Sequence, residues 1–409
     1  MRIFLLPSWC PTVDAPIAGT FFVEQAHGLA RARPHWTIAI CLFDLARTRI
    51  PWRAWQWPRF TLDWANHART SLCIAASGLH EYRVWAPYAP RFGSQSKWQA
   101  TADGLAMQAR AALASFTASG GKPDLIHALA AYPGGTAAVL LGREFRIPVG
   151  ITEHLGPFPP PALCNSDGKP LSVVVDAYAG AARHSAVSHA LAEQIVALGL
   201  ASKVVVLPNF LPDDFGAGKV GDGTRSLKFS FLSVGGPSHE KGTDVLLQAL
   251  AKMAPDVTLR VVGSGPQRSV FQQMAASLGV AERVMWLGSV PRSDMPDVYR
   301  NADAFVLPSR TETFGVSLIE ALAHGKPLIS TRCGGPQDIV NPGNGLLVPV
   351  DDVAALARAM ELVVRASKAY NADLLRADFL ARFSTSAVIG RIEDWYLALK
   401  ADAASRGAA

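Results

Sequence analysis

The chain has 409 residues, of which 49% are hydrophobic and 18% are charged. This composition is typical of a protein with large buried cores and excludes a disordered or fibrous chain. No run of about 18 apolar residues occurs, so no membrane-spanning helix is expected. The start MRIFLLPSWCP has too short an apolar run for a secretory signal, and the five cysteines form no CxxC pair. We therefore expect a cytoplasmic protein with reduced cysteines and without structural zinc.

The net charge of +6 is unevenly distributed along the chain. Residues 1–210 hold 18 basic and 12 acidic residues, whereas residues 211–409 hold 21 of each. An anionic membrane surface, an anionic acceptor or a nucleic acid can each use such a basic surface, and a basic surface without a specific partner is equally compatible with it. The arginines are scattered and no nucleic-acid recognition motif is present, so we expect no nucleic-acid partner.

The first half of the chain alternates short apolar runs with longer helical stretches. The predicted strands are Arg2–Leu6, Thr37–Leu42, Leu125–Ala128, Val149–Thr152, His184–Ser188 and Val204–Leu207. The predicted helices are Phe21–Arg31, Gly134–Arg143, Ala177–Ala182 and Ala190–Leu198. One segment departs from this alternation, because residues 47–64 mix four tryptophans with four arginines. Such a mixture suits an element on anionic lipid headgroups, and also a helix packed on its own domain with arginine on its solvent face.

The second half repeats the alternation. Its predicted strands are Phe229–Val234, Leu259–Gly263, Val284–Leu287, Ala304–Leu307, Pro327–Thr331 and Gly345–Val348. Its predicted helices are Gly242–Met253, Ser269–Leu278, Met295–Arg300, Gly315–Ala323 and Val353–Arg365. Apolar strands alternating with helices indicate parallel sheets that are covered on both faces. We therefore predict an α/β protein with two doubly wound, Rossmann-like domains that face a central cleft.

The boundary between the two domains is placed at a Gly- and Asp-rich stretch without periodicity. This gives an N-terminal domain at 1–210 and a linker at 211–226. A C-terminal domain follows at 227–385, and a C-terminal helix at 386–409 is expected to pack back towards the first domain. Ligands of such sheets bind beyond the carboxyl ends of the strands, so the loops after the strands matter most.

Two acids flank the predicted start of a helix in the second domain. Glu312 precedes Phe314-Gly315 in a polar loop, and Glu320 follows inside the apolar stretch VSLIEALA. A helix N-terminus offers unpaired backbone N–H groups and partial positive charge, which suit a diphosphate. An acid in an apolar helix needs a reason, because a buried unpaired charge is costly. Hydroxyls of a sugar and of a ribose would give the two acids that reason, although an exposed helix acid beside a loop acid fits the spacing as well.

The string PSRTETFGVSLIEALAHGKPLISTRCGGPQDIV, residues 308–340, closely resembles the EX7E region of retaining nucleotide-sugar glycosyltransferases of family four, which have the GT-B fold. Other segments resemble the same family in the same order: PSWCPTVDAPIAGTFFVEQAHGLA, VLPNFLPDDF, SVGGPSHEKGTDVLLQAL, LRVVGSGPQR and VMWLGSVPRSDMPDVYRNADAFVLPS. The first of these is similar to the acceptor loop of members that build bacterial polysaccharides. The resemblance covers nearly the whole chain and is strongest in residues 229–350.

The resemblance implies that the first domain binds the acceptor and the second the nucleotide sugar, and it implies a role for each matching residue. The catalytic candidates are Lys241, which would neutralise the diphosphate, Glu312, which would contact the donor sugar, and His154, which would face that sugar from the first domain. Glu320 would hold the ribose hydroxyls. The remaining donor-binding candidates are Thr313, Phe314, Gly315, Gly235, Gly236 and Val290. The candidates for the acceptor or phosphate loop are Gly19, Thr20 and His127, and for His127 a packing role is an equal alternative.

One departure from the family's pattern concerns the phosphate site. The family usually has Val-Gly-Arg after the first strand of the second domain, whereas this chain has Val234-Gly235-Gly236. Either one diphosphate contact is missing, or Arg310 or His239 supplies it. A milder departure is Asn209-Phe210 in place of Asn-Gly near the linker.

The resemblance implies a metal-independent, retaining transfer of a sugar from a nucleotide-diphosphate sugar to a glycan or lipid-linked acceptor. Adjacent loop acids such as Asp351-Asp352 form no DxD-type pair, and no cofactor is expected. The turn Gly263-Ser264-Gly265 lacks a third glycine, so a nicotinamide cofactor is not expected. The alternatives are a sugar-nucleotide epimerase or phosphorylase of the same fold, and a non-catalytic sugar-binding protein.

Overall fold

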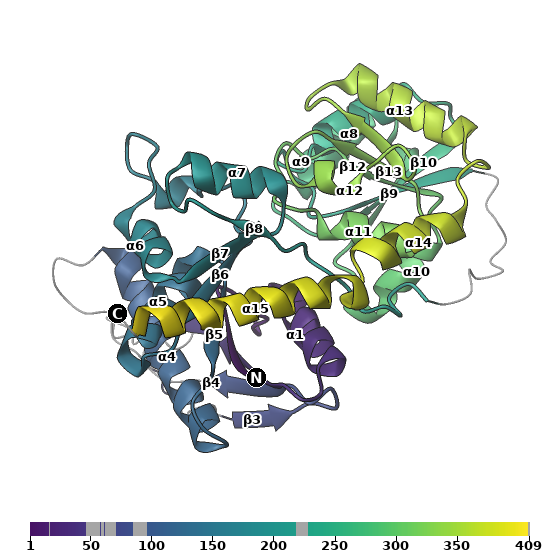
Figure 1. The fold of residues 1–409 in the computed structure, drawn as a ribbon. Coiled ribbons are helices and arrows are strands. Elements are labelled where there is room, and N and C mark those ends of the chain that lie inside the picture. The colour runs from purple at the N-terminus through teal and green to yellow at the C-terminus, as the bar shows by residue number, and fades with distance from the viewer. Residues whose placement is uncertain are drawn as a thin grey trace. The chain divides into compact units, whose positions relative to one another are not determined.

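The structure is a computed structural model that describes residues 1–15, 17–45, 58, 61, 71–84, 96–217 and 228–407. The Trp- and Arg-rich segment 47–64 lies outside the described residues except for Pro58 and Thr61, and so does the second part of the expected linker. The chain divides into two compact units (Figure 1). Unit 1 comprises Met1–Val187, Leu191–Leu207 and Val388–Ala409, and unit 2 comprises Ser188–Ala190 and Pro208–Ala387.

Unit 1 is built on an eight-stranded sheet with the order β3-β4-β2-β1-β5-β6-β7-β8. The strands are β1 (Arg2–Pro7), β2 (Thr37–Phe43), β3 (Ser71–Ile74), β4 (His80–Val84), β5 (Leu125–Leu129), β6 (Val149–Glu153), β7 (Arg183–Ala186) and β8 (Val205–Val206). Neighbouring strands are parallel except β3 and β4, which pair antiparallel. The predicted parallel sheet is confirmed in unit 1, with one antiparallel pair at its edge.

The helices of unit 1 are α1 (Thr20–Ala32), α4 (Lys97–Ala118), α5 (Thr136–Phe145), α6 (Ser172–Gly180) and α7 (His189–Ala197), and a short turn at Ala131–Gly135 precedes α5. The long helix α15 (Thr385–Gly407), drawn in yellow in Figure 1, groups with unit 1 from Val388 onward. Ion pairs of Arg33 with Glu393 and of Lys400 with Asp124 hold it there. The C-terminal segment is thus part of the core and surface of unit 1.

Unit 2 is a doubly wound α/β unit with a wholly parallel, six-stranded sheet of order β11-β10-β9-β12-β13-β14. Its strands are β9 (Phe229–Val234), β10 (Val257–Val262), β11 (Val284–Gly288), β12 (Ala304–Leu307), β13 (Leu328–Thr331) and β14 (Gly345–Val348). Its helices are α8 (Thr243–Ala251), α9 (Arg268–Ser277), α10 (Met295–Arg300), α11 (Val316–Ala323), α12 (Pro336–Ile339), α13 (Val353–Arg365) and α14 (Ala372–Arg382).

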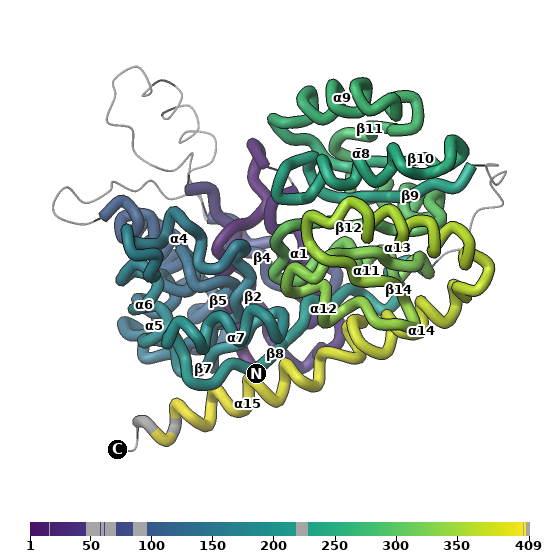
Figure 2. Tube along the Cα trace, turned by 90° about the horizontal axis from the view of Figure 1, so that it is seen from above, coloured from purple at the N-terminus to yellow at the C-terminus, as the bar shows by residue number. Residues whose placement is uncertain are grey.

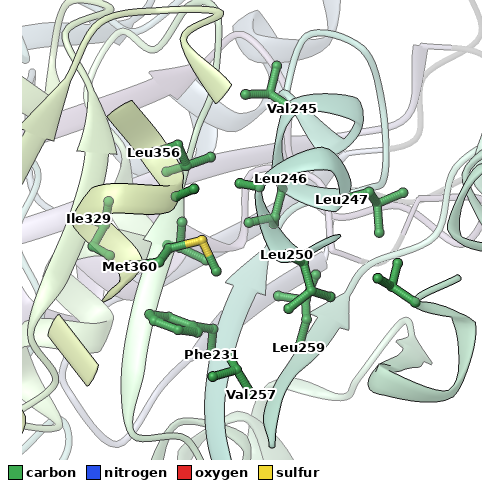
Figure 3. Close-up of a cluster of buried hydrophobic side chains, with 14 of the residues drawn as sticks. Phe231, Val245, Leu246, Leu247, Leu250, Val257, Leu259, Ile329, Leu356 and Met360 are labelled. Carbon is green, nitrogen blue, oxygen red and sulfur yellow. The ribbon is translucent and has the colours of Figure 1, made fainter. Parts of the chain in front are cut away.

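Apolar side chains of helices and strands form the core of unit 2 (Figure 3). Leu246 and Leu250 of α8 meet Leu259 of β10, and Leu356 and Met360 of α13 close the same cluster. Helices α8 and α9 lie side by side over this part of the sheet (Figure 2). Burying each such side chain stabilises the fold by about 1.5–3 kcal/mol, so this face anchors the loops at the ends of the strands.

The strand order of unit 2 determines where its loops meet. From β9 the chain moves outward through β10 and β11, then returns to β12 on the other side of β9. The neighbours β9 and β12 therefore form the topological switch point, where ligands of such sheets bind. The loop of residues 235–242 after β9 and the loop of residues 308–315 after β12 leave this edge side by side. Among the described residues, no helix is long and apolar enough to cross a membrane.

Candidate active site

Lys241 and Glu312 meet at the switch point of unit 2. The Lys241 Nζ lies 2.6 Å from Glu312 Oε1, and the Ser309 hydroxyl donates to the same oxygen at 2.9 Å. The Glu312 side chain is only 12% exposed, whereas that of Lys241 is 37% exposed. Lys241 is therefore the member of the pair that solvent or a ligand reaches more easily. The structure brings these two predicted residues together although they are 71 positions apart.

A close backbone approach makes this pair possible. Gly242 follows Lys241 with a φ of 66°, and a Cβ placed on it would lie 2.0 Å from the Pro308 carbonyl oxygen. Any side chain at this position would force the loops after β9 and β12 apart. The glycine in the sequence HEKG thus allows Lys241 to reach Glu312.

The phosphate-loop candidates Gly235 and Gly236 lie at the end of β9. The Gly235 N–H donates to the Val262 carbonyl at 3.0 Å, so the loop continues the sheet for one residue. A Cβ on Gly236 would lie 2.5 Å from the Ser264 carbonyl oxygen. The loop after β10 therefore fills the space that a side chain at 236 would need. This packing is the physical reason why the family's arginine does not fit here in the present backbone.

Arg310 does not have the freedom that a substitute for the missing arginine would need. Its two terminal nitrogens contact the two carboxylate oxygens of Asp244 at 2.9 and 2.8 Å, and Nη2 also contacts Asp351 at 2.6 Å. These pairings raise the pKa of Arg310 further. It also donates to the His239 carbonyl, and His239 itself lies exposed at the surface. Arg310 thus ties the loop after β12 to α8.

Glu320 is buried in α11 with a partner on each carboxylate oxygen. Its side chain is 7% exposed; Arg292 Nη1 contacts Oε1 at 2.5 Å and the Tyr299 hydroxyl donates to Oε2 at 2.6 Å. Burial, reinforced by the negative charge of Glu320, raises the pKa of Tyr299 well above its usual value, so this hydroxyl stays a donor. Arg292 and Tyr299 give the physical reason for an acid in this apolar helix, and sequence reasoning missed both. They stand in the strings VPRSD and DVYRN, where no sequence signal links them to Glu320.

The loop before α11 presents its backbone rather than its side chains. Phe314 is buried and packs edge-on against Phe383 at 6.0 Å, so only its main chain can reach a ligand. Gly315, with a φ of 98°, is the N-cap of α11, and Thr313 is half-buried before it. The first N–H groups of a helix have no partner inside the helix, which suits an anion. Val290 lies half-buried between β11 and a short turn at Arg292–Asp294.

His154 and Gly19 lie in unit 1, at the ends of β6 and of the loop after β1. The His154 ring meets the Phe22 ring edge-on at 4.9 Å, and burial, together with the nearby His127, lowers its pKa to about 3. His154 is therefore neutral at physiological pH. Gly19, with a φ of 67°, is the N-cap of α1, and the hydroxyl of Thr20 donates to the Ile17 carbonyl at 3.2 Å.

A second buried acid supports the His154 loop. Glu153 Oε1 accepts from the N–H groups of His154 and Leu155 at 2.8 and 2.9 Å, and Oε2 accepts from the Ala131 N–H and the Tyr178 hydroxyl at 3.1 and 3.0 Å. Burial raises the pKa of Glu153, although all four hydrogen bonds act in the opposite direction. No sequence signal indicated this role, because the partners come from three separate segments.

For His127 the structure favours the packing alternative over an acceptor contact. The ring is buried in unit 1, with Nδ1 2.8 Å from the Tyr396 hydroxyl and Nε2 2.6 Å from the Thr152 hydroxyl. The Trp395 ring lies 5.0 Å away, and burial lowers the His127 pKa to about 3. These contacts with α15 and β6 support the packing role, and the acceptor contact of His127 stays a prediction.

Ligands of doubly wound parallel sheets bind at the switch point, which is where Lys241 and Glu312 meet in unit 2. Residues 18–215 match the family model described as Glycosyltransferase Family 4, and residues 223–373 match the model described as Glycosyl transferases group 1. The chain belongs to the family-4 glycosyltransferases of the GT-B fold.

Curated relatives and a solved structure agree with this assignment. The chain is 36% identical over 131 residues to the GDP-mannose-dependent alpha-(1-6)-phosphatidylinositol monomannoside mannosyltransferase of Mycolicibacterium smegmatis, covering 29% of this chain and 34% of that protein. It is 33% identical over 181 residues to the lipopolysaccharide core biosynthesis glycosyltransferase LpsE of Rhizobium meliloti, covering 42% and 51%. The matches thus span a third to a half of these relatives. The structure of HepE of Anabaena in complex with UDP-glucose has a TM-score of 0.69 at 19% identity, covering 97% of this chain and 100% of that one, which shows the fold.

Proposed function

We propose that this protein is a retaining glycosyltransferase that moves a sugar from a nucleotide-diphosphate sugar to a hydroxyl of a glycan or lipid-linked acceptor. We place it in the biosynthesis of bacterial cell-surface polysaccharide, because one relative is named as a phosphatidylinositol monomannoside mannosyltransferase and another as a glycosyltransferase of lipopolysaccharide core biosynthesis. The observation that carries the proposal is the Lys241–Glu312 pair at 2.6 Å, held at the switch point beside the N-terminus of α11.

In this proposal the donor's diphosphate is bound without a metal. Lys241 and the first amides of α11 face the phosphate oxygens, whose negative charge grows as the sugar leaves. Lys241 exchanges or shares its contact with Glu312 when the donor enters. Glu312 then accepts hydrogen bonds from hydroxyls of the donor sugar, and Glu320 accepts them from the ribose.

The partners of the two acids support a binding role for each. A double displacement would use one carboxylate as nucleophile and a second carboxyl as acid. Glu312 is held by Lys241 and Ser309, and Glu320 by Arg292 and Tyr299. We therefore propose substitution on one face of the sugar. The acceptor oxygen bonds to the anomeric carbon as the bond to the diphosphate breaks, and the leaving phosphate oxygen takes the hydroxyl proton.

Unit 1 supplies the acceptor side in this proposal. Neutral His154 is a hydrogen-bond partner for a hydroxyl of the donor sugar, and Gly19 and Thr20 border the loop that receives the acceptor. We also propose that the protein works in the cytoplasm, in peripheral contact with the anionic inner face of the membrane. The basic excess of residues 1–210 supports the membrane contact.

Calorimetric titration with UDP, GDP, ADP and their sugar conjugates tests the donor site. We expect the parent to bind one nucleoside diphosphate, and Lys241→Ala and Glu320→Gln to weaken that binding at least tenfold, the size of one lost charge-assisted hydrogen bond. Lys252→Ala and Glu361→Gln, at exposed residues of the same unit, are the matched controls. Nuclear magnetic resonance of the product with the cognate sugar then gives the anomeric configuration. A parent that binds no nucleotide would contradict the proposal, and an inverted product would contradict its retaining mechanism.

A further inference from the structure

Segments far apart in the sequence of unit 2 meet around the carboxylate of Glu320. We call the set the Glu320 cluster; it consists of Phe215, Arg292, Tyr299, Glu320 and His324. They come from the segment before β9, the turn after β11, helix α10 and helix α11 with its C-cap. The cluster holds the carboxylate at both oxygens.

The two contacts fix the orientation of the carboxylate. Arg292 contacts Oε1 and the Tyr299 hydroxyl donates to Oε2, so rotation of the carboxylate about the Cγ–Cδ bond of Glu320 would break both contacts. An ionised carboxylate has about four acceptor positions, and these two contacts use one on each oxygen. One further position on each oxygen then points in a fixed direction. Two such positions match in number the two neighbouring hydroxyls of a ribose.

Arg292 is itself held in place from the other side. Its guanidinium lies 4.9 Å from the centroid of the Phe215 ring, within the range of a cation–π contact. The Phe215 ring meets His324 edge-on at 5.5 Å, and His324 stacks on Tyr299 at 5.0 Å. Arg376 Nη1 donates a hydrogen bond to the Phe215 carbonyl oxygen at 2.6 Å, which fixes the backbone that carries this ring. The Arg292 side chain remains 34% exposed, so solvent reaches part of it.

We propose that Arg292 is a positioning residue for ribose recognition: it locks Glu320 in the orientation that accepts both ribose hydroxyls of the donor nucleotide. The inference rests on the proposed function, because it takes Glu320 as the ribose-binding group. A flexible carboxylate would lose conformational entropy on binding the two hydroxyls, whereas a locked one has already lost it. Arg292 thereby sets the selectivity of the site for ribonucleotides over deoxyribonucleotides.

This role differs in its consequences from a direct contact between Arg292 and phosphate. A phosphate contact would contribute equally to ribonucleotides and deoxyribonucleotides, since both carry the same diphosphate. A positioning role acts through the hydroxyls and disappears when they are removed. Varying the protein and the ligand together therefore separates the two explanations.

The experiment measures dissociation constants by calorimetry for UDP, GDP and ADP and for their 2′,3′-dideoxy forms. The proteins are the parent, R292Q, R292K, Y299F and the control R365Q, whose arginine forms an exposed i,i+4 pair with Glu361. Circular dichroism and thermal unfolding show whether each variant is folded. For the cognate base, we expect the parent and R365Q to bind the ribonucleotide about 10- to 100-fold more tightly than the dideoxy form.

In R292Q we expect that ratio to fall to about 3 or less, mainly through weaker binding of the ribonucleotide. R292K keeps the charge but not the planar fork, so its ratio should lie between those of R292Q and the parent. Y299F frees the other oxygen and should lower the ratio too, which keeps the test valid if R292Q fails to fold. An unchanged ratio in R292Q and Y299F, or equal weakening of both nucleotide forms, would overturn the inference while the proposed function stands. A parent that binds no nucleotide would overturn both.

Discussion

Replacing His127 by glutamine tests the view that this histidine is a neutral core residue of unit 1. Burial lowers the pKa of His127 to about 3, whereas an unfolded histidine has a pKa of about 6.5. Between these values the unfolded chain binds a proton that the folded chain does not, so the free energy of unfolding falls as the pH is lowered. From pH 7.5 to pH 5 the protonation of one unfolded histidine costs about 2 kcal/mol of stability, at 1.36 kcal/mol per pKa unit.

The variant removes this pH-dependent loss together with two hydrogen bonds. At pH 7.5 we expect His127→Gln to lower the free energy of unfolding by about 1–3 kcal/mol, because Tyr396 and Thr152 lose well-placed partners. At pH 5 the parent has lost the additional 2 kcal/mol and the variant has not, so the difference between them should shrink by about that amount.

Urea unfolding followed by tryptophan fluorescence measures this difference at both pH values. Nine of the ten tryptophans fall within the ranges of unit 1, so the fluorescence reports mainly on the unfolding of that unit. His35→Gln, at an exposed histidine of the same unit, is the matched control for the loss of a histidine. If parent and His127→Gln lost stability equally between pH 7.5 and pH 5, His127 would titrate in the folded protein, and its assignment as a neutral core residue would be wrong.

Two further substitutions test the packing around Gly236 in unit 2 and the hydrogen bonds of Glu153 in unit 1. Gly236→Arg should lower the melting temperature by several degrees and leave nucleotide affinity unimproved, because a Cβ there meets a carbonyl oxygen at 2.5 Å. Its control is Gly265→Arg, where the nearest contact would be 3.3 Å; tighter nucleotide binding by Gly236→Arg would refute the steric argument. Glu153→Gln should lower the stability of unit 1 by about 1–3 kcal/mol in urea unfolding, since an amide NH₂ would face a backbone N–H. Glu144→Gln, at an exposed acid paired with Arg110, is its control, and equal stabilities would show that Glu153 is not needed as an acceptor.

Much of unit 2 could be predicted because its elements follow simple periodicities. The predicted ranges Phe229–Val234, Ala304–Leu307, Gly345–Val348, Met295–Arg300 and Val353–Arg365 agree with the structure residue for residue. Buried parallel strands are continuous apolar runs, and the helices between them carry one apolar stripe. Such signals depend only on neighbours in the sequence.

The elements missed in the sequence have identifiable causes. The edge strand β3 is exposed at all four residues. Because neither of its faces is buried, its sequence SLCI does not need to alternate apolar and polar residues. Helix α14 has only two buried residues among eleven, and its apolar stripe is correspondingly weak. Helix α4 is different: Ala102, Leu105, Ala109, Leu113 and Phe116 are buried at helical spacing. That pattern was present in the sequence and was overlooked because small alanines make up part of it.

In the candidate site, too, some features could be predicted from the sequence and others depend on tertiary packing. The family resemblance singled out Lys241 and Glu312, and their contact follows from the adjacency of β9 and β12. Arg292 and Tyr299 could not be predicted as partners of Glu320, because such pairing depends on how α10 and the turn after β11 pack on α11. The roles themselves stay predictions until ligand binding is measured.

In the proposed donor site, the pairing of charges offsets the lack of an arginine at position 236. Glu312 contacts Lys241 and Glu320 contacts Arg292, so neither acid presents an uncompensated negative charge to an entering diphosphate. Arg310 likewise neutralises Asp244, whose pKa falls below its usual value because the hydrogen bonds from Arg310 outweigh the effect of burial. Repulsion of the donor is thereby low without an extra cation. Attraction then depends on the short-range contacts of Lys241 and of the amides of α11, which salt screens less than long-range charge. We therefore expect the affinity for the donor, measured by calorimetry, to change little with ionic strength, and a steep fall with added salt would contradict this argument.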